Sequence, residues 1–163
     1  MMSDIVFVIG PESSGTRGTA KLLISNGYWG NDSHAQALDS FILGERELRD
    51  IVPEGRDRIV FRRSIPHARS FPDILKIDTM FLEAGCRTKW LVVLRDLAEI
   101  VRSKVGRQHV EDSNQGILNT IYEYQWILEK ASYKSNGVFF FPFTYYIKQP
   151  KQAVQLLKSI EIL

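Results

Sequence analysis

The residues best suited to chemistry lie between an apolar segment and a helical pattern near the start of the chain. Residues 10–17 read Gly-Pro-Glu-Ser-Ser-Gly-Thr-Arg. The backbone N–H groups of such a loop, together with the N-terminus of the helix that follows, can bind an anion. Side-chain hydroxyls and one guanidinium add further donors. We therefore predict a phosphate-binding loop whose ligand contacts come from Ser13, Ser14, Gly15, Thr16 and Arg17.

This loop is not a Walker A motif. That motif requires Lys followed by Ser or Thr directly after its second glycine. Here Thr16 and Arg17 occupy those two positions. The sequence thus indicates a phosphate-bearing ligand and argues against the usual Mg²⁺-nucleotide chemistry, and no metal site is predicted.

A second basic site follows the apolar segment at residues 90–94. Arg95 and Asp96 come directly after it, and Ser103 lies about two helical turns further on. An arginine at the end of a strand can donate two hydrogen bonds to a phosphate, and a serine hydroxyl can add a third. The alternative is a structural ion pair for Arg95 and a solvent-exposed Ser103.

A third group follows another apolar segment, where residues 61–67 read Phe-Arg-Arg-Ser-Ile-Pro-His. Arg62 supplies a cation. His67 is a candidate general base, because histidine exchanges its proton near neutral pH. The alternative for His67 is a surface position after a proline turn.

Apolar segments alternate with helical patterns along the chain. We expect strands at residues 5–9, 58–64, 90–94 and 138–143, and helices at residues 16–26, 35–47, 71–84, 97–105, 112–133 and 151–159. This order predicts a three-layer α/β/α domain with a mainly parallel sheet of about four to five strands. Asp96 is the expected N-cap of the helix at 97–105.

Three of these strands end at Gly10, Ser64 and Arg95. Ligands of parallel sheets bind beyond the carboxyl ends of the strands, so these positions should converge. Pro142 places the last strand near an edge of the sheet. On the helix at 112–133, the core-facing stripe is expected to contain Ile117, Ile121, Tyr124 and Leu128.

Composition restricts the class of protein. The chain has 163 residues, a length that suits one domain over residues 1–163. Its net charge is +2 without a block of Lys and Arg, so nucleic acid is not an expected partner. Cys86 is the single cysteine, which excludes an intrachain disulfide. We find no signal peptide and no membrane span, and expect a cytoplasmic protein.

Taken together, the motifs resemble those of the nucleotide-dependent sulfotransferases. That family has a loop of the form Gly-Pro-x-Lys-x-Gly-Thr-Thr or Gly-x-Arg-x-Gly-Thr-Arg, which residues 10–17 match except at the basic position. Its second motif is an apolar strand ending in Arg, with a Ser eight residues later, as in Arg95 and Ser103. Residues 143–150, Phe-Thr-Tyr-Tyr-Ile-Lys-Gln-Pro, are similar to its tyrosine-rich strand end and closing helix.

The resemblance implies a P-loop sulfotransferase-like fold and 3′-phosphoadenosine 5′-phosphosulfate (PAPS) as co-substrate, without a metal. It implies that the loop binds the 5′-phosphosulfate and that Arg95 and Ser103 hold the 3′-phosphate. Arg62 stands where the family's Lys contacts the sulfuryl group. The catalytic base is left open between His67, His34 and Glu12.

One departure from the family concerns charge. The family's loop Lys aligns with Ser13, which carries no cation. Transfer of a sulfuryl group builds negative charge on the 5′-phosphate, so a nearby cation is expected. Arg17 or Arg62 would have to supply it.

The acceptor is expected to be a saccharide or small molecule, in a site that is either open or completed by a second subunit in a homodimer. Neither a membrane nor nucleic acid is an expected partner. Two other functions stay open: a non-catalytic protein that binds 3′-phosphoadenosine 5′-phosphate (PAP), and a small P-loop kinase. The kinase would need a loop Lys, a Ser or Thr for Mg²⁺ and an acidic residue after a buried strand, where only Asp96 is available.

Overall fold

The centre of the chain is a sheet of four parallel strands in the order β2-β1-β3-β4. The computed structural model describes residues 3–30, 51–52, 54–66, 70–134 and 136–163, so the expected helix at 35–47 lies outside the described residues, as do His34 and His67. The strands are β1 (Asp4–Gly10), β2 (Arg58–Ser64), β3 (Arg87–Leu94) and β4 (Val138–Pro142).

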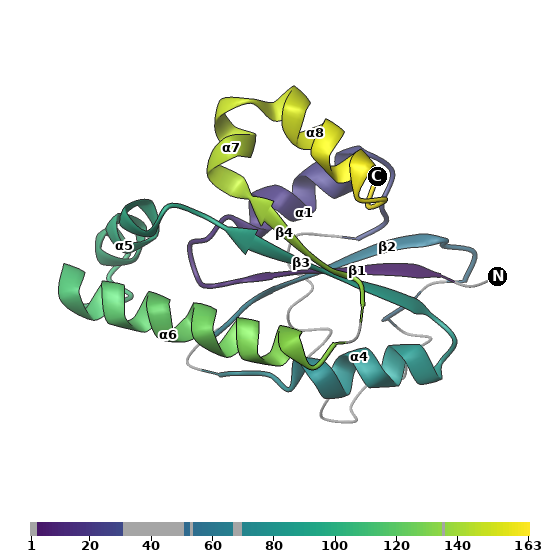
Figure 1. Cartoon of the computed structure of the whole chain (residues 1–163), viewed down its shortest axis with the longest axis horizontal. Helices are drawn as coiled ribbons and strands as arrows, with labels where there is room; N and C mark the ends of the chain where they lie inside the picture. Colours follow the sequence, from purple (N-terminus) through teal and green to yellow (C-terminus); the bar gives the residue numbers. More distant parts are fainter. Residues whose placement is uncertain (1–2, 31–50, 53, 67–69, 135) are drawn as a thin grey trace.

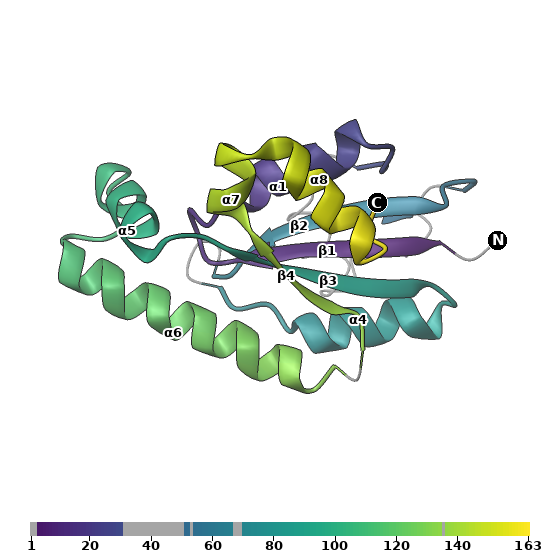
Figure 2. The same ribbon diagram turned by 45° about the horizontal axis from the view of Figure 1, so that its top comes forward.

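Helices cover both faces of this sheet. Figures 1 and 2 show α1, α7 and α8 on one face, α4 and α6 on the other, and α5 beyond the carboxyl end of β3. Their bounds are α1 Thr16–Ser25, α4 Ile74–Glu83, α5 Leu97–Gly106, α6 Ser113–Ser132, α7 Phe143–Lys148 and α8 Pro150–Ser159. The predicted three-layer α/β/α architecture with a parallel sheet is confirmed. None of the described helices is both long and apolar enough to cross a membrane.

The central strand β1 is buried on both faces, which explains its uninterrupted apolar sequence. Ile5 and Ile9 pack in the cluster formed with α4 and α6. Val6 and Val8, which point the opposite way, pack in the cluster with α1 and α8. All four side chains are at most 2% exposed. The strand therefore holds the loop that follows it on a rigid base.

Several boundaries differ from the predicted ones. β3 begins at Arg87 rather than residue 90, because its polar first residues pair with β1 in the register Asp4↔Arg87. The helix expected from residue 71 begins at Ile74, because the Asp73 side chain accepts from the Lys76 N–H and caps it. The short helix α7 was not predicted. The edge position of Pro142 is confirmed, because β4 is the outer strand.

On α6 the predicted core-facing stripe is wrong for three of its four members, while Tyr124 is half-buried. Ile117, Ile121 and Leu128 are 37%, 51% and 44% exposed. The buried side lies one residue earlier at each step, through Gly116, Thr120, Glu123, Ile127 and Ala131. Two interactions with α5 fix this rotation. A Cβ at Gly116 would lie 3.0 Å from Val101 Cγ1, so the helices approach closely there, and Lys104 forms a buried ion pair with Glu123.

Candidate functional site

The carboxyl ends of three strands meet at the loop of residues 10–17. The Ile65 N–H, just after β2, donates to the Gly10 carbonyl over 2.9 Å. Arg95, just after β3, donates from Nη1 to the Ser13 carbonyl over 2.9 Å. The predicted convergence of Gly10, Ser64 and Arg95 is therefore confirmed, and β1, β2 and β3 each position part of one site.

The loop itself is held in a tight conformation. The Ser14 N–H donates to the Pro11 carbonyl over 3.1 Å. Ser13 has a φ of 68° and Gly15 a φ of 101°, both in the left-handed region. A Cβ at Gly10 would lie 2.5 Å from Ser14 Oγ. Glycine is therefore needed at the end of β1, where the Ser14 hydroxyl packs against the backbone.

The loop leads into a helix N-terminus that, within the described residues, has no side-chain cap. Gly15 is the N-cap of α1 and makes no side-chain hydrogen bond to the first turn. Within the described residues, the buried hydroxyl oxygens of Ser13 and Ser14 also have no hydrogen-bond partner. Ser14 is fully buried. A buried hydroxyl without a partner costs about 1–3 kcal/mol, and a bound anion could satisfy it together with the first N–H groups of the helix.

Arg62 brings a positive charge to this helix end. The side chain belongs to β2 and is 8% exposed. Its Nη1 lies 3.3 Å from Ser64 Oγ and 3.5 Å from Thr16 Oγ1, and these two hydroxyls lie 3.3 Å apart. Arg17, the other candidate for the missing cation, is exposed on the first turn of α1. The structure thus places Arg62 beside the loop residue Thr16.

Arg95 forms the structural ion pair that was the alternative to a phosphate contact, and it also contacts the loop. Its Nε donates to Glu99 Oε2 over 3.0 Å, so it does form a structural ion pair. The same guanidinium binds the Ser13 carbonyl and lies over the ring of Phe143, 5.6 Å from its centre. These contacts use Nε and Nη1, and a guanidinium carries further N–H donors on Nη2. Ser103 lies half-buried on α5.

Tyr124 of α6 holds the end of β3, a role that the sequence did not reveal. Its hydroxyl accepts from the Arg95 N–H over 3.1 Å and donates to the Val93 carbonyl over 3.2 Å. Burial raises the pKa of Tyr124, and its contact with the Arg95 backbone opposes that rise. The phenol therefore stays a neutral positioning group for Arg95.

Asp96 caps α5, as predicted. Its carboxylate accepts from the Glu99 N–H over 3.0 Å, and its own N–H donates to Thr144 Oγ1 over 3.2 Å. The carboxylate that a kinase would need after this strand is thus engaged in a helix cap. Among the described residues, no three His, Cys, Asp or Glu side chains are grouped as metal ligands.

A cluster of charged side chains lies beside the loop, and only Glu12 among its members was predicted as a candidate site residue. Glu12 Oε2 lies 3.3 Å from Nδ1 of His109, which follows α5. Next to them, Lys104 of α5 and Glu123 of α6 pair at 2.6 Å, with 2% and 7% of their side chains exposed. His109 was missed because it belongs to no motif, and only the packing of α5 brings it to the loop.

Burial is the main cause that raises the pKa of Glu123, and the hydrogen bond from Lys104 opposes it. The charge of Glu12 adds a smaller upward effect on this pKa. Glu12 is therefore close enough to act electrostatically on the ion pair between α5 and α6.

No protein-family model matches the sequence, and no curated protein is significantly similar to it. Among solved structures, a retinol dehydratase in a complex with retinol and PAP is similar with a TM-score of 0.47 and 14% identity. The match covers 98% of this chain and 60% of that one, so the chain spans about three fifths of the length of its structural neighbour. A similarity of this size assigns neither a family nor an activity.

Proposed function

We propose that this protein is a sulfotransferase that moves a sulfuryl group from PAPS to a hydroxyl or amine of a saccharide or small molecule. The observation that carries the proposal is the uncapped N-terminus of α1, where the buried Ser14 hydroxyl has no partner among the described residues. The Ser14 hydroxyl, the backbone N–H groups of the loop and those of the first turn of α1 form a set of donors suited to a tetrahedral anion.

Two arginines give the proposed site its positive charge. Arg62 lies beside Thr16 and Ser64 and supplies the cation that Ser13 cannot. Arg95 is fixed against the loop at Ser13 and would hold the 3′-phosphate together with Ser103. In this assignment Ser13, Ser14, Gly15, Thr16 and Arg17 surround the 5′-phosphosulfate.

In the proposed reaction, the acceptor oxygen or nitrogen attacks the sulfur atom. A bond from the acceptor to sulfur forms, and the bond from sulfur to the 5′-phosphate oxygen breaks, which leaves PAP. The negative charge that grows on the 5′-phosphate is stabilised by the helix N-terminus and Arg62. His67 accepts the proton of the acceptor in this proposal, although it lies outside the described residues. No step requires a metal ion.

A second candidate is a non-catalytic PAP-binding protein. The observation in its favour is Ser13, which occupies the position of the family's lysine and adopts a left-handed conformation with a φ of 68°. A site with fewer cations can retain a nucleotide and still stabilise the transition state poorly. A kinase is less compatible with the site, because Asp96 caps α5 and Thr16 contacts Arg62 and Ser64.

Calorimetric titration with PAP in the absence of Mg²⁺ tests the binding site. Arg62→Met and Arg95→Ala should each weaken PAP binding by at least about tenfold, because charge-assisted hydrogen bonds contribute about 1.5–3 kcal/mol. Arg56→Met is the matched control, since Arg56 is exposed before the start of β2 and its loss changes net charge equally. Binding of ATP only with Mg²⁺, and no binding of PAP, would overturn the proposal.

A transfer assay with radiolabelled PAPS separates an enzyme from a binder. We expect transfer by the wild-type protein, a loss with His67→Ala and a gain with Ser13→Lys, which restores the family's cation. PAP binding without transfer to any acceptor by the wild type or by Ser13→Lys would favour the non-catalytic protein.

A further inference from the structure

The carboxyl end of β4 also reaches the proposed anion site. The pairing of β3 with β4 ends at Leu94 and Pro142, so the next residues of the two strands, Arg95 and Phe143, come side by side beyond the sheet. Phe143 begins α7, which Figures 1 and 2 show on the same face of the sheet as α1. The fourth strand therefore directs an aromatic ring toward the start of α1.

This ring packs where two glycines make room for it. A Cβ at Gly15 would overlap the Phe143 ring at Cδ1, and a Cβ at Gly18 would lie 2.8 Å from its Cε2 atom. Gly15 has a φ of 101° and suits glycine for its backbone as well. Gly18 lies within α1, where glycine is an unfavourable residue. The close approach of the ring explains why this position has no side chain.

The same ring supports Arg95. The guanidinium carbon lies 5.6 Å from the ring centre, a distance at which a cation is attracted to an aromatic face. Its Nη1 donates to the Ser13 carbonyl over 2.9 Å. Phe143 thus contacts both parts of the proposed site, the loop and the arginine. Because Phe143 is only 9% exposed, these contacts are made in the interior of the protein.

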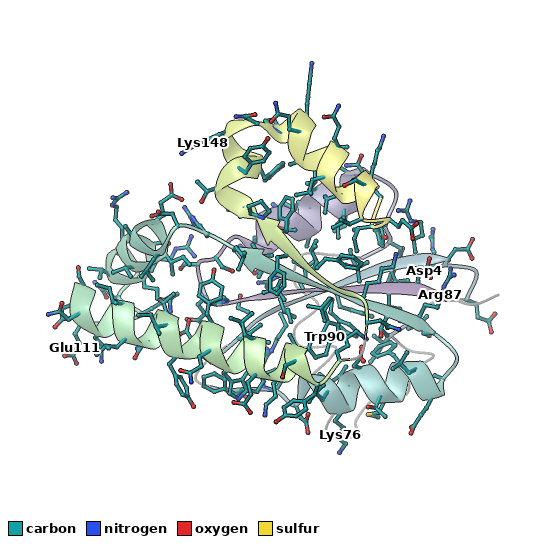
Figure 3. All side chains as sticks on the ribbon, in the orientation of Figure 1. Asp4, Lys76, Arg87, Trp90, Glu111 and Lys148 are labelled. Carbon is teal, nitrogen blue, oxygen red and sulfur yellow. The ribbon has the colours of Figure 1, made fainter. Side chains whose placement is uncertain are left out.

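The ring is itself held in place. The ring of Tyr146, one turn further along α7, lies with its centre 5.7 Å from that of Phe143. The Asp96 N–H donates to Thr144 Oγ1 over 3.2 Å, which fastens the first turn of α7 to the segment after β3. Lys148, labelled in Figure 3, marks the other end of this short helix. The position of Phe143 is therefore set by both β4 and α7.

We propose that Phe143 is a positioning residue that fixes the distance between the loop and Arg95, and so makes the site selective for nucleotides with a phosphate group at both the 5′ and the 3′ position. This inference rests on the proposed function, which assigns the two phosphates to the loop and to Arg95. A ligand with two anionic groups gains from the second group only if the two subsites are held at a matching distance. A nucleotide with the 5′-phosphate alone does not depend on that distance. Phe143 acts here through Gly15 and Arg95.

PAP and adenosine 5′-phosphate (AMP) are the appropriate probes, because they differ only in the 3′-phosphate. Both would be titrated by calorimetry without Mg²⁺, and for the wild type we expect PAP to bind at least about tenfold more tightly. Phe143→Leu keeps an apolar side chain and removes the flat ring. It should weaken PAP binding by at least about tenfold and AMP binding by less than about threefold, because AMP uses the loop alone. The ratio of the two affinities is the readout, since general loosening of the fold would weaken both alike.

Phe81→Leu is the matched control. Phe81 is fully buried in the cluster on the other face of the sheet, with its ring centre 5.5 Å from that of Phe7. Its replacement removes the same ring from the interior. We expect Phe81→Leu to lower the thermal stability at least as much as Phe143→Leu and to leave the ratio of PAP to AMP affinity unchanged.

Gly18→Ala tests the contact from the other side. The added methyl group would displace the ring of Phe143, so this variant should also lower the ratio of PAP to AMP affinity. In a protein that already carries Phe143→Leu, the same change should have little further effect, because the ring that it displaces is gone. If Phe143→Leu does not fold, the ratio for Gly18→Ala decides alone.

Equal wild-type affinity for PAP and AMP would overturn this inference, as would an unchanged ratio in Phe143→Leu or in Gly18→Ala. In each of these cases PAP binding by the wild type would still support the proposed function. If the wild type binds neither nucleotide, the inference and the proposed function fall together.

Discussion

At the scale of single residues, the site is built from groups that the folded chain leaves incompletely satisfied. Ser14 is fully buried, and its hydroxyl has no hydrogen-bond partner within the described residues. Gly15, the N-cap of α1, has no side chain that could cap the start of the helix. Natural proteins accept such local departures mainly at functional sites, where a ligand supplies the missing contacts.

Replacement of Ser14 by alanine tests this interpretation. Ser14→Ala should raise the free energy of unfolding of the ligand-free protein by about 1 kcal/mol, because an unsatisfied buried hydroxyl is removed. The same change should weaken PAP binding several-fold. Urea denaturation and calorimetry measure the two effects.

Ser25→Ala is the control for this substitution. Ser25 lies exposed at the end of the same helix, and its hydroxyl donates to the Lys21 carbonyl over 2.8 Å. Its replacement should change stability by less than about 0.5 kcal/mol and leave binding unchanged. A strong loss of stability in Ser14→Ala would show that the hydroxyl has a structural partner.

At the scale of elements, α6 shows that helical periodicity does not determine which side of a helix is buried. The stripe through Ile117, Ile121 and Leu128 has regular helical spacing, yet these side chains are exposed. The neighbouring stripe is buried because Gly116 lets α5 approach and because Glu123 pairs with Lys104. Gly116 and Glu123 therefore rotate the buried face of α6 by about one residue, or 100°, from the predicted face.

Two isoleucines on α6 provide a matched test. Ile127 is fully buried and Ile121 is 51% exposed. Ile127→Ala should lower the free energy of unfolding by about 2–5 kcal/mol through lost burial and a cavity. Ile121→Ala changes helix propensity equally but should cost less than about 1 kcal/mol. Similar losses for both in urea denaturation would mean that the exposed stripe is covered in solution.

At the scale of the whole molecule, the last residues of the chain pack against its beginning. Ile162 is fully buried, and its carbonyl accepts hydrogen bonds from the Tyr28 hydroxyl and from Arg58 Nη2, the latter over 2.8 Å. Lys89 donates to the Glu161 carbonyl. These contacts join the segment after α8 to the segment after α1 and to the strands β2 and β3. They therefore hold α1 and α8 against the sheet from which the proposed anion site is built.

Substitution of this terminal contact should affect the stability of the whole domain. Ile162→Ala should lower the free energy of unfolding by about 2–5 kcal/mol, as for an isoleucine in the interior. Ile160→Ala, at a half-buried position two residues earlier, should cost about 1 kcal/mol. Thermal and urea denaturation measure both. An Ile162→Ala variant as stable as Ile160→Ala would show that these final residues do not contribute to the cooperative fold.

The sequence by itself determined the four strands, the loop of residues 10–17 and the convergence of Gly10, Ser64 and Arg95. These features follow from local signals: uninterrupted apolar segments, glycines at a required turn, and the rule that parallel strands end on one side. The Asp96 cap and the edge position of β4 are local in the same sense.

Only the tertiary structure decided the rotation of α6, the contact of Arg62 with Thr16, the fixing of Arg95 by Tyr124, and the meeting of Glu12 with His109. Each depends on the distance and angle between elements far apart in the chain. Those quantities are set by packing and by buried charge pairs, such as that between Lys104 and Glu123, which leave no periodic pattern in the sequence.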